Sequence, residues 1–338
     1  MDPNSANRKL INKLSPQELK MRLERETFKR ITLSFYRYVI ISEPQRFRNE
    51  LYEELAKLNC FGRIYVAKEG INAQMNVPEE HFEDLKQLLN RYPELKNMPL
   101  KIAVEDDGRS FLKLTIKVRN QIVADGLPHN EYDVTNVGNH LTAKEWNNAL
   151  EQGALVVDMR NHYESEIGRF ENAIMPPVET FREELPWVLN HLKGKENEKI
   201  LLYCTGGVRC EKTSSYLKHH GFNNVNQLLG GIIDYARQIK EEDLENKFKG
   251  KNFVFDNRLG EQISCDVISH CHQCGAPCDS HTNCANKACN LLFIQCPNCA
   301  EKHAKCCSDI CKEVIGGNLH PSKMPKFGTN KRFFKMIG

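Results

Sequence analysis

The sequence predicts a multi-domain α/β protein that carries a cysteine-rich module near its C-terminus. Three observations predict this class. Strand-like and helix-like segments alternate over the first third of the chain, a short glycine-rich loop joins a strand to a helix at Cys204, and eleven of the fourteen cysteines lie between Cys265 and Cys311. A chain of 338 residues is long enough for two or three domains with cores of their own.

The composition argues against a membrane protein. No apolar run reaches the length of a membrane span, the mean hydropathy is −0.55, and the first residues lack the apolar core of a secretory signal. A reactive thiol together with CxxC pairs is typical of a reducing compartment, so we expect a cytoplasmic protein with no membrane partner. A net charge of +3 is too small to indicate whether the protein binds nucleic acid. We expect no DNA partner.

Residues 31–125 follow the order strand, helix, strand, strand, helix, strand. Helix-like segments with one apolar face begin after Pro44 and at Pro78. The strand-like runs lie at 35–41, 62–67, 71–77, 100–104 and 111–123. This order predicts a ferredoxin-like sandwich, in which helices cover one face of the sheet and the other face stays open.

The open sheet face is a candidate platform for RNA. Lys113, Lys117 and Arg119 share one face of their strand, because alternate residues point the same way. Lys68 lies at a strand junction, in Lys68-Glu-Gly-Ile-Asn72. A solvated strand face explains the first three residues equally well, and a simple turn explains Lys68 better.

The C-terminal tail is basic and contains phenylalanines. Lys331 and Arg332 stand beside Phe333 and Phe334. Basic residues interleaved with aromatic ones contact phosphates and stack on bases, which favours RNA binding by this tail. A solvated terminus is an equal alternative.

The stretch Cys204-Thr-Gly-Gly-Val-Arg209 follows an apolar run and precedes a helix-like segment. A cysteine at such a junction becomes reactive, because the loop N–H groups and the helix N-terminus stabilise a thiolate or a bound anion. Two glycines let those N–H groups point inward, and Arg209 adds a fixed cation. We therefore predict Cys204 and Arg209 as catalytic residues. The predicted anion-binding loop consists of Thr205, Gly206, Gly207 and Val208.

The length of this loop, with four residues between Cys204 and Arg209, resembles that of the rhodanese domain. Cysteine phosphatases have five intervening residues and a wider cradle, whereas the shorter loop suits a persulfide. Three further segments resemble the same family, at 154–161, 166–174 and 216–232. The resemblance implies an α/β domain with a parallel sheet. We expect Asp158 and Arg160 to shape the pocket rather than react.

Two CxxC pairs, Cys271/Cys274 and Cys296/Cys299, stand 21 residues apart in the cysteine-rich segment. Such pairs place two thiolates on one tetrahedral ion at about 2.3 Å each. A segment this short, with few large apolar residues, needs metal binding to fold. Zinc is the default metal, although thiolates also hold iron–sulfur clusters.

The number of cysteines predicts two structural zinc ions. One division gives the first ion Cys271, Cys274, Cys296 and Cys299, and draws the second site from Cys278, Cys284, Cys289, Cys307 and Cys311. Interleaved cross-brace pairings are equally allowed by the spacing. Three histidines are alternative ligands but fit surface positions better: His272, His281 and His303. An all-cysteine site is closed, with no open position for catalysis.

The order of these parts, with Ala67-Lys-Glu-Gly-Ile-Asn-Ala73, Cys204-Thr-Gly-Gly-Val-Arg-Cys-Glu-Lys212 and the CxxC module, resembles the tRNA uridine hydroxylase family of rhodanese-like proteins. The resemblance implies oxygen-dependent conversion of the wobble uridine, position 34 in the anticodon region of tRNA, to 5-hydroxyuridine. It places the family's reactive cysteine on Cys204 and includes Cys210 in the matching motif.

The mechanism is a hypothesis. Hydroxylation with O2 usually calls for a flavin or a redox metal, but the sequence has no dinucleotide fingerprint and zinc has no redox chemistry, so the redox cofactor is unknown. We expect Cys204, as a thiolate or as a persulfide, to add to C6 of the uracil and raise the electron density at C5. Cys210 would resolve an oxidised or persulfidated Cys204.

Three other functions remain open. A sulfurtransferase would carry a persulfide on the same cysteine, a phosphatase is disfavoured by the loop length, and a non-catalytic RNA-binding scaffold would not need Cys204. The predicted divisions are an extension (1–30), a ferredoxin-like domain (31–125), a linker (126–140), a rhodanese-like domain (141–250), a zinc module (251–312) and a basic tail (313–338).

Overall fold

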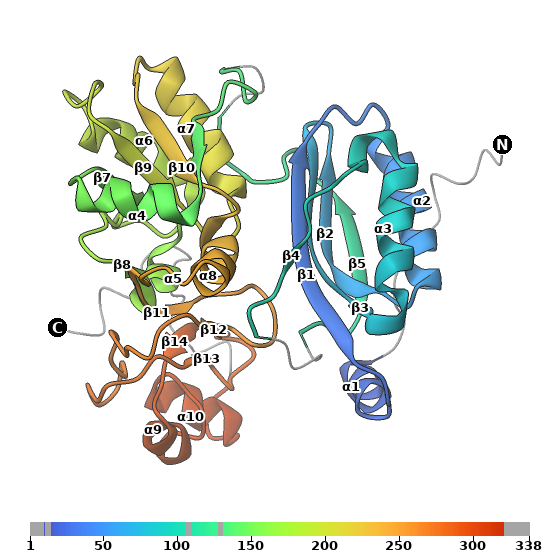
Figure 1. Ribbon diagram of the computed structural model, residues 1–338. Helices are drawn as coiled ribbons and strands as arrows, with labels where there is room; N and C mark the ends of the chain where they lie inside the picture. The colour runs from blue at the N-terminus through green and yellow to red at the C-terminus, as the bar shows by residue number, and fades with distance from the viewer. Residues whose placement is uncertain (1–9, 11–14, 106–109, 128–130, 321–338) are drawn as a thin grey trace.

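The computed structural model describes residues 10, 15–105, 110–127 and 131–320. An N-terminal domain with one sheet stands beside a central α/β domain, and the cysteine-rich module lies below the central domain in Figure 1. Lys331 and Arg332 lie outside the described residues. Among the helices of the described part, none combines the length and the apolar composition that crossing a bilayer requires.

The N-terminal domain confirms the predicted ferredoxin-like order. After α1 (Pro16–Glu24), its elements are β1 (Arg30–Tyr38), α2 (Pro44–Lys57), β2 (Phe61–Ala67), β3 (Gly70–Pro78), a 3-10 turn (Glu79–His81), α3 (Phe82–Arg91), a 3-10 turn (Pro93–Leu95), β4 (Lys101–Ile102) and β5 (Leu114–Val118). The sheet order is β4-β1-β3-β2-β5. The first four strands pair antiparallel, and β5 is added parallel to β2.

Alternation along β1 divides the two faces of this sheet. Leu33 and Phe35 are buried in the core together with Leu51 and Leu55 of α2. The alternate residues Ser34 and Tyr36 line a cavity on the opposite face. That face of the sheet is turned toward the central domain (Figure 1). The face that the sequence left open is therefore covered by another part of the same chain.

The central domain is built on a parallel sheet of order β6-β10-β9-β7. Its elements are β6 (Asn139–Leu141), α4 (Ala143–Glu151), β7 (Leu155–Asp158), α5 (His162–Glu166), β8 (Gly168–Phe170), α6 (Phe181–His191), β9 (Ile200–Tyr203), α7 (Val208–His219), β10 (Val225–Leu228) and α8 (Gly231–Glu241). All four residues of β9 are buried, as expected for an inner strand of a parallel sheet. Cys204 follows directly at the carboxyl end of that strand.

The cysteine-rich module continues from a small antiparallel sheet. Strand β11 (Phe248–Asn252) pairs with β8 and with β12 (Glu261–Gln262). A hairpin of β13 (His281–Asn283) and β14 (Leu292–Ile294) and two short helices, α9 (Pro297–Lys302) and α10 (Asp309–Ile315), complete the module. Its two small clusters of buried residues consist largely of cysteine, which indicates that apolar packing is not its main source of stability.

Hydrogen bonds from β1 join the N-terminal sheet to helix α7. The Tyr36 hydroxyl donates to Glu211 Oε1 at 3.0 Å, and the Tyr38 hydroxyl donates to the carbonyl oxygen of Val208 at 3.1 Å. Both acceptors lie in the first two turns of α7, directly after the Cys204 loop. The docking of the two domains therefore also fixes the loop against the sheet.

A buried lysine strengthens this junction. Lys212 Nζ lies 2.8 Å from Asp125 Oδ2 and 3.1 Å from Glu69 Oε2, and its side chain is almost fully buried. Glu69 belongs to the turn between β2 and β3, so the segment that contains Lys68 acts here as a docking turn. A buried cation with two carboxylate partners is costly to separate, because each charge would lose its counter-charge.

Candidate active site

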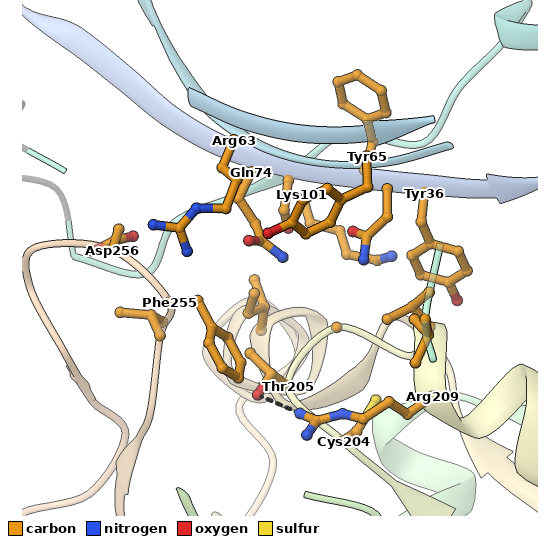
Figure 2. A pocket seen from close by; sticks show the side chains of 18 of the residues that line it. Tyr36, Arg63, Tyr65, Gln74, Lys101, Cys204, Thr205, Arg209, Phe255 and Asp256 are labelled. Atoms are coloured by element: carbon orange, nitrogen blue, oxygen red, sulfur yellow. Dashed lines mark hydrogen bonds between the residues drawn. The ribbon is translucent and has the colours of Figure 1, made fainter. Parts of the chain in front are cut away.

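The sheet of the N-terminal domain and the Cys204 loop face each other across a cavity of about 440 Å³ (Figure 2). The sheet contributes Ser34, Tyr36, Arg63, Tyr65, Asn72, Gln74 and Lys101 to its wall. The opposite wall includes Cys204, Thr205, Gly206, Val208, Arg209 and Phe255. The cavity therefore exists only because the two domains are docked.

The backbone of the loop aims an N–H group at the reactive sulfur. Gly207 has φ +97°, a conformation that favours glycine, and its N–H donates to Cys204 Sγ at 3.1 Å. A Cβ on Gly207 would also lie 2.7 Å from the Tyr36 hydroxyl, so the docked sheet leaves no room for a side chain. The loop therefore offers a backbone donor to the sulfur of Cys204.

Cys204 and Cys210 have opposite ionisation behaviour. Burial alone would raise the pKa of Cys204, but a hydrogen bond from the Cys210 thiol, the charge of Arg209 and backbone N–H groups lower it to about 5. Burial, and then the hydrogen bond to Cys204, raise the pKa of Cys210 well above its usual value of 9.0. At neutral pH the pair is a thiolate with a neutral thiol as its donor.

Arg209 is held by a carboxylate that the sequence analysis did not single out. Its Nη1 lies 2.6 Å from Glu164 Oε1, and its Nη2 lies 2.8 Å from Glu164 Oε2. This two-point ion pair fixes the guanidinium group beside the loop, and Thr205 joins it through a weaker hydrogen bond, drawn in Figure 2. Arg209 therefore acts on the thiolate mainly through its charge.

Asp158 and Arg160 form a second buried ion pair, away from the cavity. Arg160 Nη2 lies 2.6 Å from Asp158 Oδ2, and the Tyr203 hydroxyl donates to the same oxygen at 2.6 Å. Both charged side chains are almost fully buried, and neither lines the cavity. The pair fixes the turn after β7, whose next residue, Asn161, does reach the cavity wall.

Glu184 is a further buried acid near the reactive cysteine. It lies on α6, has no exposed surface, and neither carboxylate oxygen has a hydrogen-bond partner in the described residues. Burial, aided by the negative charges of Glu164 and Cys204 and opposed by Arg209, raises its pKa to about 8. Glu184 is therefore mainly protonated at neutral pH. The sequence around Glu184 reads as an ordinary amphipathic helix, so it did not indicate a buried acid at this position.

The sequence signals for the other unpredicted residues were weak. Glu164 stands three residues after Asn161, the spacing of a capping box, and the structure forms that box. Lys101 lies in a strand of two residues, too short for its alternation to indicate a face. Glu211 and Lys212 belong to the motif that begins at Cys204, but Tyr36 and Glu69, with which they interact, lie in another domain.

The cysteine-rich module brings eight thiols into two groups of four. The first group contains Cys271, Cys274, Cys296 and Cys299, and the second contains Cys284, Cys289, Cys307 and Cys311. Within each group all sulfur atoms lie within 4.8 Å of one another. The grouping follows the division expected from the CxxC pairs, and the two groups alternate along the chain.

The sulfur separations fit a tetrahedral ion. Cys274 Sγ and Cys296 Sγ are 3.6 Å apart, and Cys307 Sγ lies 3.7 Å from the sulfur of Cys289 and 3.7 Å from that of Cys311. A tetrahedron with metal–sulfur bonds of about 2.3 Å has edges of about 3.8 Å. The residues present therefore fit zinc, and all four ligand positions of each group are filled by protein.

Cys278 was predicted as a possible ligand of the second ion. The structure corrects this prediction, because Cys278 lies outside both groups. Its backbone N–H donates to Ser269, and its side chain packs in the small cluster around Ile294. None of the three histidines joins a group. His272 pairs with Glu166, His281 is buried against Tyr163 and Phe253, and His303 lies beside Asp309.

Of the residues considered for RNA binding, those that the structure describes are exposed and lie outside the cavity. Lys68 occupies the turn between β2 and β3, and Lys117 projects from β5. Arg119 lies over the ring of Tyr65, and Tyr65 also lines the cavity. Lys113 lines a neighbouring groove that shares Arg63 and Phe255 with the cavity wall.

Three family models match the chain in sequence order. The UPF0176 acylphosphatase like domain matches residues 30–122, the Rhodanese-like domain matches 142–238 and the Rhodanase C-terminal model matches 249–312. Together they span all three structural parts. The central match contains Cys204 and Arg209, and the last contains both groups of four cysteines.

Curated relatives align over nearly the whole chain. A tRNA uridine(34) hydroxylase from Leptospira interrogans is 56% identical over 309 residues, which is 91% of this chain and 84% of the relative. One from Yersinia pestis (strain Pestoides F) is 53% identical over 308 residues, 90% of this chain and 87% of the relative. Among solved structures, a rhodanese-like domain protein from Staphylococcus aureus is 28% identical, covers 29% of this chain and 90% of its own, and has a TM-score of 0.25.

Proposed function

The chain belongs to the family of tRNA uridine(34) hydroxylases, and from this premise we propose that it hydroxylates uridine 34 of tRNA at C5, with Cys204 as the nucleophile. The observation that carries the proposal is a cysteine with a pKa lowered to about 5 in the wall of a cavity of about 440 Å³. The thiolate is the attacking form of cysteine.

The cavity lining suits a single nucleobase. Tyr36, Tyr65 and Phe255 offer aromatic surfaces for stacking, and the amides of Asn72 and Gln74 offer donors and acceptors for the base edge. A base must leave its stack to enter such a site, and bases in the anticodon loop do so at low cost. We therefore place the anticodon region at the mouth of the cavity, and infer a cytoplasmic site of action from the tRNA substrate.

The chemistry that we propose begins with addition of Cys204 Sγ to C6 of the uracil. The addition raises the electron density at C5, where one atom of the co-substrate O2 is then transferred. The second oxygen atom leaves as water, which requires two electrons and two protons. Oxidation of Cys204 and Cys210 to a disulfide supplies both, so that uridine, O2 and two thiols give 5-hydroxyuridine, water and a disulfide.

The two groups of four cysteines are proposed to hold one structural zinc ion each. Cysteine fills all four ligand positions, which leaves no position for water or substrate. The first group packs on Ile167 and Phe253, and the Phe253 carbonyl oxygen accepts a hydrogen bond from Thr205 of the reactive loop. Zinc would thus support one side of the catalytic cavity.

The proposal is tested by nucleoside mass spectrometry of tRNA from cells that lack the protein. We expect 5-hydroxyuridine and its derivatives to disappear, and to return with the wild-type protein but not with Cys204→Ala. Cys60→Ala is the matched control, because Cys60 is buried in the N-terminal domain, away from the cavity. Full restoration by Cys204→Ala would contradict the proposal and would indicate a non-catalytic scaffold.

A sulfurtransferase would use the same cysteine differently. It would take sulfur from thiosulfate and pass it to an acceptor in the absence of tRNA. Intact-protein mass spectrometry after thiosulfate treatment distinguishes the two functions. We expect no tRNA-independent sulfur turnover, and steady turnover would favour the sulfurtransferase.

A further inference from the structure

Lys101 is a buried lysine that faces the catalytic cavity from strand β4. Its side chain is only 7% exposed, and its Nζ lies 4.1 Å from the centre of the Tyr36 ring (Figure 2). Within the described residues it has neither a hydrogen bond nor an ion pair. A buried ammonium group without a carboxylate partner is costly to retain, which marks it as a functional group.

The other cations in the cavity wall differ from Lys101. Arg209 is neutralised by Glu164, and Arg258 is neutralised by Asp256 and Glu261. Arg63 has no such partner within the described residues, but its side chain is exposed and remains hydrated. Lys101 is thus the buried cation of this wall whose donors remain available to a bound molecule.

The charges around Lys101 and the donors of its ammonium group determine which ligand atom it can bind. Burial lowers the pKa of Lys101, whereas the charges of Asp234, Cys204 and Glu211 raise it. Lys101 and Cys204 both belong to the lining of the same cavity. An ammonium group has three donors and no acceptor, so it recognises a carbonyl or anionic oxygen and rejects an amino group.

We propose that Lys101 binds the C4 oxygen of the target uracil and stabilises the negative charge that forms there when Cys204 attacks. This inference rests on the proposed function. In the step, the thiolate lone pair forms the S–C6 bond, the C5=C6 π pair moves to C4–C5, and the C4=O π pair moves to the oxygen. Lys101 keeps its proton and donates a hydrogen bond to the resulting enolate.

The same contact makes Lys101 a specificity-determining residue. Uracil presents an oxygen at C4, whereas cytosine presents an amino group that only donates. Cytosine in the cavity would leave Lys101 buried and unpartnered, which costs far more than the loss of one neutral contact. The contact therefore explains why a uridine, and not a cytidine, would be accepted at the reacting position.

The test compares Lys101→Gln, Lys101→Arg and the control Lys57→Gln, an exposed lysine on α2 at the opposite face of the same domain. The substrate is an anticodon stem-loop RNA with uridine at position 34. We expect Lys101→Gln to lower kcat by about 10²- to 10³-fold, the usual effect of removing a donor to a developing oxyanion. Lys101→Arg should retain more activity than Lys101→Gln, and Lys57→Gln should match the wild type.

Two further measurements separate catalysis from structure. RNA with 5-fluorouridine at position 34 should form a covalent adduct with the wild type and much less with Lys101→Gln. The rate at which iodoacetamide alkylates Cys204 should stay the same in both proteins. An unchanged kcat in Lys101→Gln would overturn the proposal, and so would an equal loss of Cys204 alkylation and activity in both Lys101 variants.

The outcome also distinguishes this proposal from the function on which it rests. If Lys101→Gln hydroxylates at the wild-type rate while Cys204→Ala is inactive, the role of Lys101 is wrong and the nucleophile stands. If Cys204→Ala keeps full activity while Lys101→Gln loses it, the nucleophile is wrong and the contact to the base stands.

Discussion

The reactive loop and the cysteine-rich module use cysteine in opposite ways. In the loop, one thiolate is stabilised by the Gly207 N–H group, the Cys210 thiol and the charge of Arg209. In the module, four sulfur atoms converge within 4.8 Å in each of two groups. Four thiolates so close repel one another, so burial and neighbouring thiolates raise the pKa of Cys307, although, against the effect of burial, backbone hydrogen bonds lower the pKa of Cys271 to about 6.

The difference shows what keeps a cysteine available for chemistry. Fixed dipoles and the charge of Arg209 stabilise a single anion on a loop that lines the cavity, although Cys204 itself is fully buried. A group of four thiolates needs a cation at its centre. Each sulfur then donates a lone pair to the metal ion. The loop thiolate is therefore expected to persist when metal is removed, whereas the module is not.

The largest expected effect is unfolding of the cysteine-rich module when one zinc-binding cysteine is replaced. We expect Cys296→Ser to bind one zinc ion fewer per chain and to unfold residues of the module, because structural zinc contributes about 10 kcal/mol or more to folding. Metal analysis and hydrogen exchange measure the two changes. Cys265→Ser is the control, since Cys265 is exposed and belongs to neither group. Equal zinc content in both variants would contradict the assignment.

The loop should respond strongly to loss of the arginine's partner. Glu164→Gln leaves the buried Arg209 without its carboxylate, so we expect a loss of about 3–5 kcal/mol in the free energy of unfolding. Chemical denaturation measures it, with Glu171→Gln as an exposed control near α5. Stability equal to the wild type would mean that the ion pair does not anchor the loop.

A smaller effect comes from Glu184, through its dependence on pH. Its pKa in the folded protein is about 8, above the usual value of 4.5, so the folded state binds the extra proton between those values. Stability should therefore fall as pH rises from about 4.5 to 8, by a few kcal/mol at most, since one pKa unit corresponds to about 1.36 kcal/mol. Glu184→Gln should flatten this slope and exceed the wild type in stability at pH 8. An unchanged slope would contradict the assignment.

Local sequence patterns predicted both the Cys204 loop and the cysteine-rich module. The strand, glycine loop and helix around Cys204 and the spacing of the CxxC pairs are encoded within short segments, because turn geometry and metal ligation depend on neighbouring residues. The order of strands in the N-terminal domain followed from periodicity. Its first strand runs over 30–38 instead of 35–41, because the apolar run at its end continues into the loop before α2.

The contents of the cavity could not be predicted from such patterns. Lys101 belongs to the N-terminal domain, so only domain docking brings it to the cavity that Cys204 lines. Glu164 and Glu184 lie on two helices of the same domain as Cys204, but far from it in the sequence. The open sheet face was expected to be solvated or to bind RNA along β5, and the structure adds that it forms one wall of the cavity. No local signal encodes which surface a sheet face will meet.

The most direct test of the account is the pH dependence of Cys204 alkylation. Iodoacetamide reacts with the thiolate, so peptide mass spectrometry of the full-length protein across pH reports the ionisation of this one sulfur. We predict a midpoint near pH 5, and a higher midpoint in Cys210→Ala because that variant loses a donor to the thiolate. A midpoint near 9, the ordinary value for cysteine, would contradict the claim that this loop holds a thiolate at neutral pH.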